Sequence, residues 1–186
     1  SDDLDFFCNQ NPAYVEGVQE IFEGLIKASQ SGQFSIEPSK TIRDRDFTQI
    51  YLRRADVVLK LDMVNDVAPH FGDLETHPVL GSVDSWQNIL SNKVTALSRL
   101  EIKDFIDLWT IAMHRQFDWR TVFAEAKQKD TGLDVMMMYE LLRSVPAESL
   151  NLVKWVKRID DERLIRGFAL MADDLFYGRN NSLCSS

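Results

Sequence analysis

A change in hydrophobic periodicity near residue 82 is the strongest constraint on the fold of this chain. Before it, short extended stretches separated by most of the glycines and prolines predict strands and one helix. After it, apolar residues recur at helical spacing almost to the C-terminus. The sequence therefore predicts an α+β fold, with a small mixed-sheet core in residues 1–82 followed by an all-helical lobe in residues 83–186.

The expected elements follow from local patterns of apolar, turn and capping residues. Strands are predicted at 4–8, 34–36, 41–45, 47–53 and 57–64. Helices are predicted at 12–32, 86–97, 101–115, 118–129, 132–143, 146–157 and 160–177. Residues 65–83 are expected to form a long connection, and Asp84 or Ser85 is expected to cap the helix that follows.

Composition narrows the classes of function. The net charge of −8 argues against a protein that coats nucleic acid non-specifically. Every apolar run is broken by charge, so no membrane span is expected. The two cysteines lie near opposite ends, which favours a reducing cytoplasm over a disulfide framework. The chain begins with Ser and enters a strand at once, so residues upstream are expected.

Three acidic residues form the main candidate site. Asp3 and Asp5 lie two apart in an extended segment, so both should project from one face while Leu4 and Phe6 point to the core. Asp62 lies on another predicted strand, opposite an apolar row. If the two strands are neighbours, three carboxylates converge, and a divalent cation such as Mg²⁺ would relieve their repulsion. The alternative for a bare Asp-x-Asp pattern is surface charge.

Two helical segments carry a family resemblance. The run from Ile89 to Arg99, ILSNKVTALSR, is followed by Lys103 to Leu108, KDFIDL. Together they resemble the helical signature of the AbiEii/AbiGii toxin family: Lys-x-x-Ala-Leu, Arg, then a basic residue and Asp-x-x-Asp-Leu. The opening SDDLDFF is similar to the family's Ser-x-Asp-apolar-Asp-apolar-Phe segment, and Asp62 matches its third acidic strand residue.

The resemblance implies a polymerase-beta-like nucleotidyltransferase core with an appended helical lobe. It implies that Asp3 and Asp5 bind a metal, Mg²⁺ or Mn²⁺, and that Asp62 completes the site or acts as general base. Family members are toxins of bacterial toxin–antitoxin and phage-defence systems. Several transfer a nucleotide from a nucleoside triphosphate, in some cases to tRNA ends, which implies a triphosphate, an antitoxin and tRNA as partners.

The resemblance also assigns roles in the helical lobe. Lys93 would contact the phosphates of the nucleotide, and Asp104 and Asp107 would face the cleft. The alternative from the bare sequence is that Lys93 is solvated and that the two aspartates pair with Lys103 or Arg99 on the surface.

The sequence departs from the family pattern in two ways. A Gly-Gly-Thr/Ser-Ala-Leu segment, which cradles the triphosphate, is expected upstream of Asp3 and is not in this sequence. The chain as given is therefore expected to lack full catalytic competence. Lys103 replaces the usual Arg and would lose a bidentate carboxylate contact.

Whether the chain is an enzyme therefore stays open at this stage. The leading hypothesis is metal-dependent nucleotidyl transfer to a hydroxyl acceptor. The runner-up is a catalytically degenerate domain that binds a partner protein, such as an antitoxin, or a nucleotide without turnover. A weaker third hypothesis is an RNA-contacting adaptor that uses the basic stretch from Arg43 to Arg54.

Overall fold

The computed structural model describes residues 3–184 and divides into two compact units. The N-terminal unit, Ser1–Ala68, contains a mixed sheet and one long helix; the C-terminal unit, Pro69–Ser186, is helical apart from one small hairpin. The predicted α+β class is thereby confirmed. The change in periodicity predicts a domain boundary after residue 82, whereas the compact units divide after Ala68.

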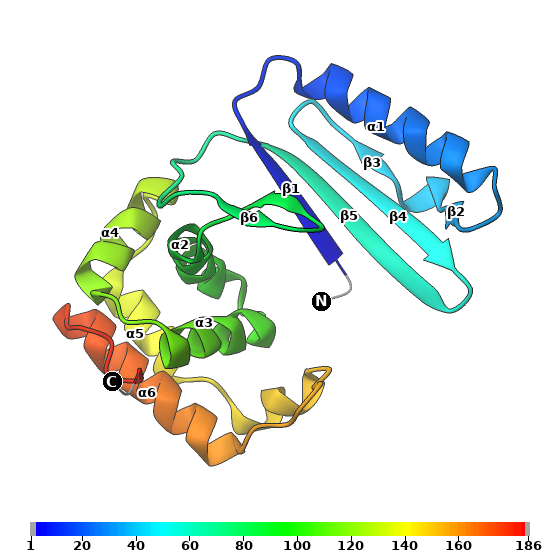
Figure 1. Ribbon diagram of the computed structural model, residues 1–186. Coiled ribbons are helices and arrows are strands. Elements are labelled where there is room, and N and C mark those ends of the chain that lie inside the picture. The colour runs from blue at the N-terminus through cyan, green and yellow to red at the C-terminus, as the bar shows by residue number, and fades with distance from the viewer. Residues whose placement is uncertain (1–2, 185–186) are drawn as a thin grey trace. The chain divides into compact units, whose positions relative to one another are not determined.

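The N-terminal unit is built around a five-stranded sheet. Its elements are β1 (Asp3–Asn9), α1 (Tyr14–Ser29), β2 (Ser35–Ile36), the 3-10 turn η1 (Pro38–Lys40), β3 (Ile42–Arg43), β4 (Phe47–Arg54) and β5 (Val57–Asp66). The strand order is β1-β5-β4-β2, and β3 also pairs with β4 (Figure 1). Strand β1 runs parallel to β5, and the remaining pairs are antiparallel, so the sheet is mixed as predicted.

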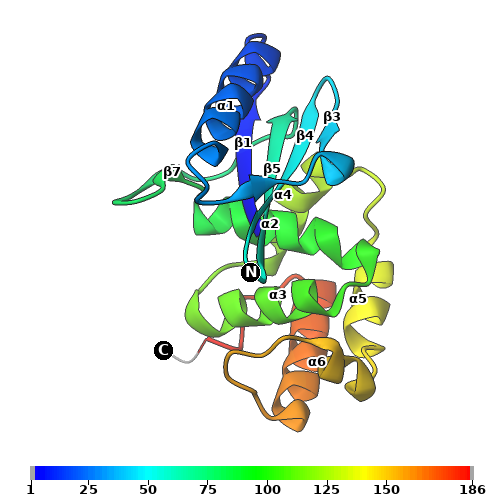
Figure 2. The ribbon, with the colours of Figure 1, turned by 90° about the vertical axis from the view of Figure 1, so that its right-hand side faces the viewer.

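Helix α1 covers one face of this sheet (Figure 2). Tyr14 and Val18 on the helix pack against Ile50, Leu61 and Met63 on β4 and β5. The Tyr14 hydroxyl also donates a hydrogen bond to the Met63 carbonyl oxygen at 2.7 Å. Because side chains alternate along a strand, the polar residues between these apolar ones project from the opposite face.

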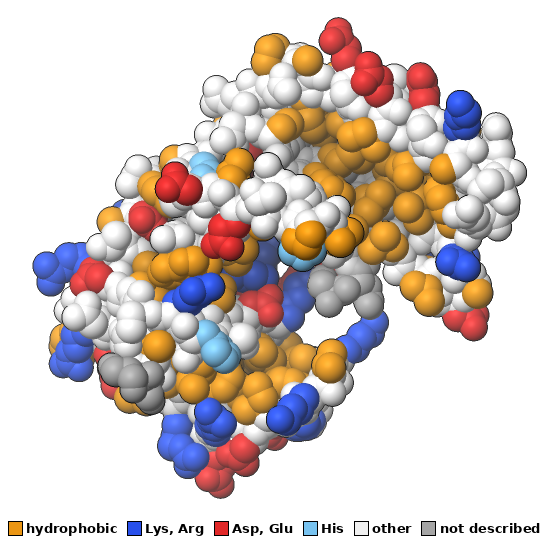
Figure 3. Space-filling model, viewed as in Figure 1, with side chains coloured by type: hydrophobic (Ala, Val, Ile, Leu, Met, Phe, Trp, Pro, Cys, Tyr) orange, Lys and Arg blue, Asp and Glu red, His pale blue; other side chains and the backbone are white. Residues whose placement is uncertain are grey.

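Strand β1 lies at one edge of the sheet. It pairs with β5 and with no other strand among residues 3–184. Its register sets Leu4 opposite Leu61 and Phe6 opposite Met63, on the face that α1 covers. Leu4 is nevertheless 36% exposed and Phe6 48% exposed. Both side chains therefore lie on the predicted face but are not buried in the core as predicted. An edge strand has a neighbouring strand on one side only, so its side chains are covered less. Hydrophobic side chains gather over this unit, in the upper right of Figure 3.

The C-terminal unit begins with a hairpin and continues as helices. Its elements are β6 (Glu75–His77), β7 (Gly81–Val83), α2 (Trp86–Ala96), η2 (Leu97–Arg99), α3 (Ile102–His114), α4 (Trp119–Lys129), α5 (Val135–Arg143), η3 (Ala147–Leu152) and α6 (Asp161–Tyr177). Four helices begin at side-chain caps that accept hydrogen bonds from backbone N–H groups: Ser85, Asp118, Asp134 and Asp160.

The largest departure from the predicted elements is the segment 146–157. It forms the 3-10 turn η3 rather than an α-helix, and the chain is extended at Val153. Ser149 donates a side-chain hydrogen bond to the Pro146 carbonyl oxygen, and the Trp155 indole N–H donates one to the Leu150 carbonyl oxygen. Such side-chain bonds satisfy carbonyl groups that a regular α-helix would pair with backbone N–H groups.

The core of the C-terminal unit contains one very close helix–helix contact. Gly167 lies in the middle of α6 and faces Trp109 of α3. A Cβ atom at position 167 would lie 2.1 Å from the indole Nε1 of Trp109, so glycine alone fits there. The indole N–H is buried and finds no hydrogen-bond acceptor among the described residues. Gly167 is therefore required by packing, although its backbone conformation is ordinary.

Candidate functional site

The three predicted aspartates lie on neighbouring strands. In the parallel register of β1 and β5, Asp5 stands opposite Asp62, and Asp3 stands opposite Lys60. Paired residues of adjacent strands project from the same face of a sheet. Asp3, Asp5 and Asp62 therefore share the face that α1 does not cover. We call this surface the carboxylate face and define it by Asp3, Asp5, Lys60, Asp62 and Gln49.

Lys60 lies among these carboxylates and binds two of them. Its Nζ is 2.7 Å from Oδ2 of Asp62 and 3.4 Å from Oδ2 of Asp3. The hydrogen bond with Asp62 raises the pKa of the Lys60 ammonium, and this outweighs the lowering caused by partial burial. Lys60 therefore carries a full positive charge at neutral pH. Its position two residues before Asp62 predicts that it lies on the same face, but no sequence motif marks Lys60 as a site residue.

Gln49 fixes the remaining oxygen of Asp62. It lies on β4, directly opposite Asp62 in the antiparallel register. Its Nε2 donates a hydrogen bond to Asp62 Oδ1 at 2.8 Å. Both carboxylate oxygens of Asp62 are therefore held, one by an amide and one by an ammonium group. This arrangement fixes the orientation of the side chain in the sheet.

The donor chemistry of the carboxylate face suits a divalent cation. Carboxylate oxygens are the hard ligands that Mg²⁺ prefers, and Mg²⁺ commonly takes one or two carboxylates together with substrate phosphates. The Lys60 ammonium is a cation already accommodated by two of these carboxylates. Within residues 3–184, no group of three or more His, Cys, Asp or Glu side chains is arranged to hold a metal ion. The carboxylate face therefore suits a divalent cation that is held by two carboxylates together with phosphate oxygens of a substrate.

A second charged cluster lies in the C-terminal unit, between α2 and α3. Lys93 Nζ is 2.9 Å from Oδ1 of Asp104 and 2.6 Å from Oδ2 of Asp107. Arg99 Nη2 is 3.0 Å from Oδ2 of Asp104. The Asp104 side chain is fully buried, with 0% exposed. Its negative charge is neutralised by the two cations, Lys93 and Arg99. We call Lys93, Arg99, Asp104 and Asp107 the Lys93 cluster.

Burial and pairing act on the pKa of Lys93 in opposite directions. Burial lowers this pKa, but the hydrogen bonds to Asp107 and Asp104 raise it by more, so the net shift is upward. Lys93 is therefore a protonated, half-buried cation rather than a solvated one. The pairing of Asp104 with Arg99 agrees with the alternative weighed from the sequence, but Lys103 pairs instead with Glu101. Asp104 is also not on the surface.

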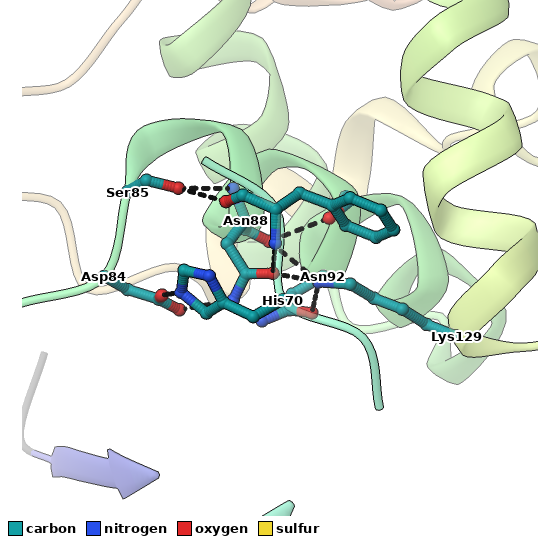
Figure 4. Close-up of polar contacts among 8 residues, drawn as sticks. His70, Asp84, Ser85, Asn88, Asn92 and Lys129 are labelled. Carbon is teal, nitrogen blue, oxygen red and sulfur yellow. Dashed lines mark hydrogen bonds and ion pairs between the residues drawn. The ribbon is translucent and has the colours of Figure 1, made fainter. Parts of the chain in front are cut away.

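A polar network anchors the start of α2 (Figure 4). Its labelled members are His70, Asp84, Ser85, Asn88, Asn92 and Lys129. His70 Nε2 bonds to Asp84 Oδ1, and Asn88 Nδ2 donates to Asp84 Oδ2 at 2.7 Å. Lys129 of α4 donates to Asn92 Oδ1 at 2.6 Å. The network ties the segment before α2 to α2 and α4, which gives His70 a structural role.

The mixed sheet, the paired acidic strands and the following helices define a protein of the nucleotidyltransferase fold. A protein-family model described as "Nucleotidyl transferase AbiEii toxin, Type IV TA system" matches residues 1–183. The chain therefore belongs to the AbiEii nucleotidyltransferase toxin family. Because the family belongs to type IV toxin–antitoxin systems, it implies an antitoxin as a partner.

Two solved structures from Helicobacter pylori share the fold. A candidate nucleotidyltransferase matches with a TM-score of 0.58 and 16% sequence identity, covering 95% of this chain and 78% of its own. The protein JHP933 matches with a TM-score of 0.56 and 19% identity, covering 95% of this chain and 76% of its own. A search of curated proteins finds no match. Among the described residues, no helix is both long and apolar enough to cross a membrane.

Proposed function

We propose that this protein transfers a nucleotide from a nucleoside triphosphate to a hydroxyl acceptor, with a divalent cation held on the carboxylate face. The observation that carries the proposal is the register of two neighbouring parallel strands, which sets Asp5 opposite Asp62. Membership of the AbiEii family and the oxygen-donor chemistry of this face support it. The family supports the reaction class, and the register supports the choice of this face of the sheet as its site.

Each residue of the carboxylate face has a proposed role. Asp3 and Asp5 would hold Mg²⁺ or Mn²⁺, which when bound neutralises charge on the triphosphate. Asp62 would complete the site or draw the proton from the acceptor hydroxyl. Gln49 keeps Asp62 in place through its hydrogen bond at 2.8 Å. Phosphoryl and nucleotidyl transfers depend mainly on such positioning and on charge stabilisation.

In the C-terminal unit, Lys93 is the proposed contact for the phosphates. Its side chain is 25% exposed, and its ammonium group is oriented by Asp104 and Asp107. The hydrogen bonds to the two carboxylates keep this lysine protonated, and a lysine ammonium binds phosphate as a point charge. Asp104 acts here as a positioning residue, since it is buried and contacts Lys93 directly. The more exposed Asp107 is the second aspartate proposed to take part in nucleotide binding.

The acceptor and the setting belong to the same proposal. A tRNA end is the acceptor that the family resemblance favours, and an antitoxin is the proposed regulator. The two cysteines, Cys8 and Cys184, are both free thiols, which supports a reducing cytoplasm as the place of action. A transfer assay with each labelled ribonucleoside triphosphate and total tRNA would identify the nucleotide and the acceptor.

The substitution Asp5→Asn tests the site directly. It removes one carboxylate charge while keeping the shape of the side chain. Mn²⁺ and a nucleoside triphosphate should bind the variant at least about tenfold more weakly than the unchanged protein, measured by isothermal titration calorimetry, because a ligand charge is lost. The matched control is Asp56→Asn, which removes the same charge from the exposed turn between β4 and β5. Equal affinity in the unchanged protein and Asp5→Asn would count against the site.

A further inference from the structure

Lys60 occupies a position that the proposed function leaves unexplained. It lies on β5 two residues before Asp62, so both side chains project from the carboxylate face. The register with β1 also sets it opposite Asp3. Its ammonium group thereby bridges two carboxylates that come from different strands, at 2.7 Å and 3.4 Å.

These contacts use the oxygens that a divalent cation on this face would need. Asp62 Oδ2 and Asp3 Oδ2 both contact Lys60 Nζ, while Asp62 Oδ1 accepts from Gln49. The side chains involved are only partly exposed, at 26% for Lys60, 24% for Asp3 and 14% for Asp62, so solvent screens them incompletely. An ammonium and a divalent cation on the same oxygens would repel each other strongly.

We propose that Lys60 is a resident counter-ion of the carboxylate face, which a divalent cation must displace and which therefore sets the cation affinity of the site. This inference rests on the proposed function, since it assigns the cation to Asp3 and Asp5, with Asp62 beside them. Without the cation, Lys60 offsets the repulsion between carboxylates on adjacent strands. With the cation, Lys60 releases both aspartates. The protein thus stays folded without metal and binds metal more weakly than the same carboxylates would without Lys60.

The test compares cation affinity in variants of Lys60. Mn²⁺ alone is titrated into the whole chain, and binding is followed by calorimetry and by the electron paramagnetic resonance of free Mn²⁺. Lys60→Met should bind Mn²⁺ about tenfold more tightly, because the competing charge is gone while the length of the side chain is kept. Lys60→Arg retains the charge and should stay near the affinity of the unchanged protein.

A general effect of net charge is separated by a matched control. Lys27→Met removes one positive charge from the last turn of α1, on the other face of the same sheet. This variant should leave Mn²⁺ affinity within about twofold of the unchanged protein, since the exposed charge is screened by salt. The double variant Lys60→Met with Asp5→Asn should lose the gain, which places the bound ion on the carboxylate face.

Thermal melting provides a second readout. In the absence of metal, Lys60→Met should melt lower than the unchanged protein, because Asp3 and Asp62 lose their shared cation. Added Mn²⁺ should raise its melting temperature by more than it raises that of the unchanged protein. The neutral variant Lys60→Gln can still donate a hydrogen bond to Asp62. It should also have a lower melting temperature without metal and a larger rise in melting temperature with Mn²⁺.

The outcomes distinguish this inference from the proposed function. If Mn²⁺ binds the unchanged protein and Asp5→Asn weakens it, but Lys60→Met and Lys60→Gln leave the affinity unchanged or lower, Lys60 is not a competitor and the proposed site stands. If neither the unchanged protein nor the Lys60 variants bind Mn²⁺, both the inference and the metal site are overturned. Tighter binding by Lys27→Met to the same degree would also overturn the inference.

Discussion

Replacing Gly167 by alanine is expected to destabilise the C-terminal unit by about 2–3 kcal/mol, the scale of overpacking in a closely packed core. The added Cβ would lie 2.1 Å from Nε1 and 2.5 Å from Cδ1 of Trp109. Trp109 is 4% exposed, so its indole has little room to move away. In an exposed helix the same change would instead gain about 1 kcal/mol, because alanine is the better helix former. The sign of the effect therefore tests the contact.

Gly24→Ala provides the control for helix propensity. Gly24 lies within α1, and a Cβ atom there would meet nothing within 4 Å. This variant should be unchanged or more stable, by up to about 1 kcal/mol. All four tryptophans lie in the C-terminal unit, so tryptophan fluorescence during urea unfolding measures the stability of the unit that contains Gly167. Circular dichroism during urea unfolding measures the stability of the Gly24→Ala variant. A stabilised Gly167→Ala would contradict the close contact with Trp109.

Asp104→Ala is expected to cost about 3 kcal/mol of stability, because it removes the buried partner of Lys93, which then keeps only the exposed Asp107. The side chain is fully buried and holds both Lys93, at 2.9 Å, and Arg99, at 3.0 Å. Arg99 is 60% exposed and can turn to solvent, so most of the cost falls on the half-buried Lys93. The measurement is urea unfolding followed by tryptophan fluorescence.

Asp107→Ala is the matched control for this substitution. It also removes a partner of Lys93, but its side chain is 51% exposed. Exposed ion pairs contribute little, so the expected cost is less than about 1 kcal/mol. Equal costs for the two variants would show that burial of Asp104 does not govern the stability of the Lys93 cluster. A triphosphate titration of both variants would separate lost stability from lost affinity.

The parts of the fold that sequence predicts well are those with a strict repeat. The alternation in β5 puts Leu61 and Met63 on one face and Lys60 and Asp62 on the other, and the structure has this arrangement. The placement of the aspartates on one face depends in addition on which strands are neighbours. The sequence leaves that pairing open, and the structure supplies it through the parallel register of β1 with β5.

The contacts that sequence did not predict join residues far apart in the chain. The pairing of Lys60 with Asp3 needs the register between two strands, and the burial of Asp104 needs the packing of α2 on α3. The hairpin of β6 and β7 was missed because its strands have three residues each, too few to show an alternation. The prediction of an α-helix at 146–157 was wrong because the apolar spacing of this segment resembles that of a helix. Its carbonyl groups instead accept hydrogen bonds from the side chains of Ser149 and Trp155.

Within the described part of the chain, β1 pairs with a strand on one side only, which has a consequence for an extended segment that adds to its other side. Backbone N–H and C=O groups along that side can template a further strand, from this or another chain. Every second residue of such a strand would then border Asp3 and Asp5, and the residues between would border Leu4 and Phe6. A shift of one residue would exchange the two sets. The register of the added strand with β1 thus determines which of its side chains lie next to Asp3 and Asp5.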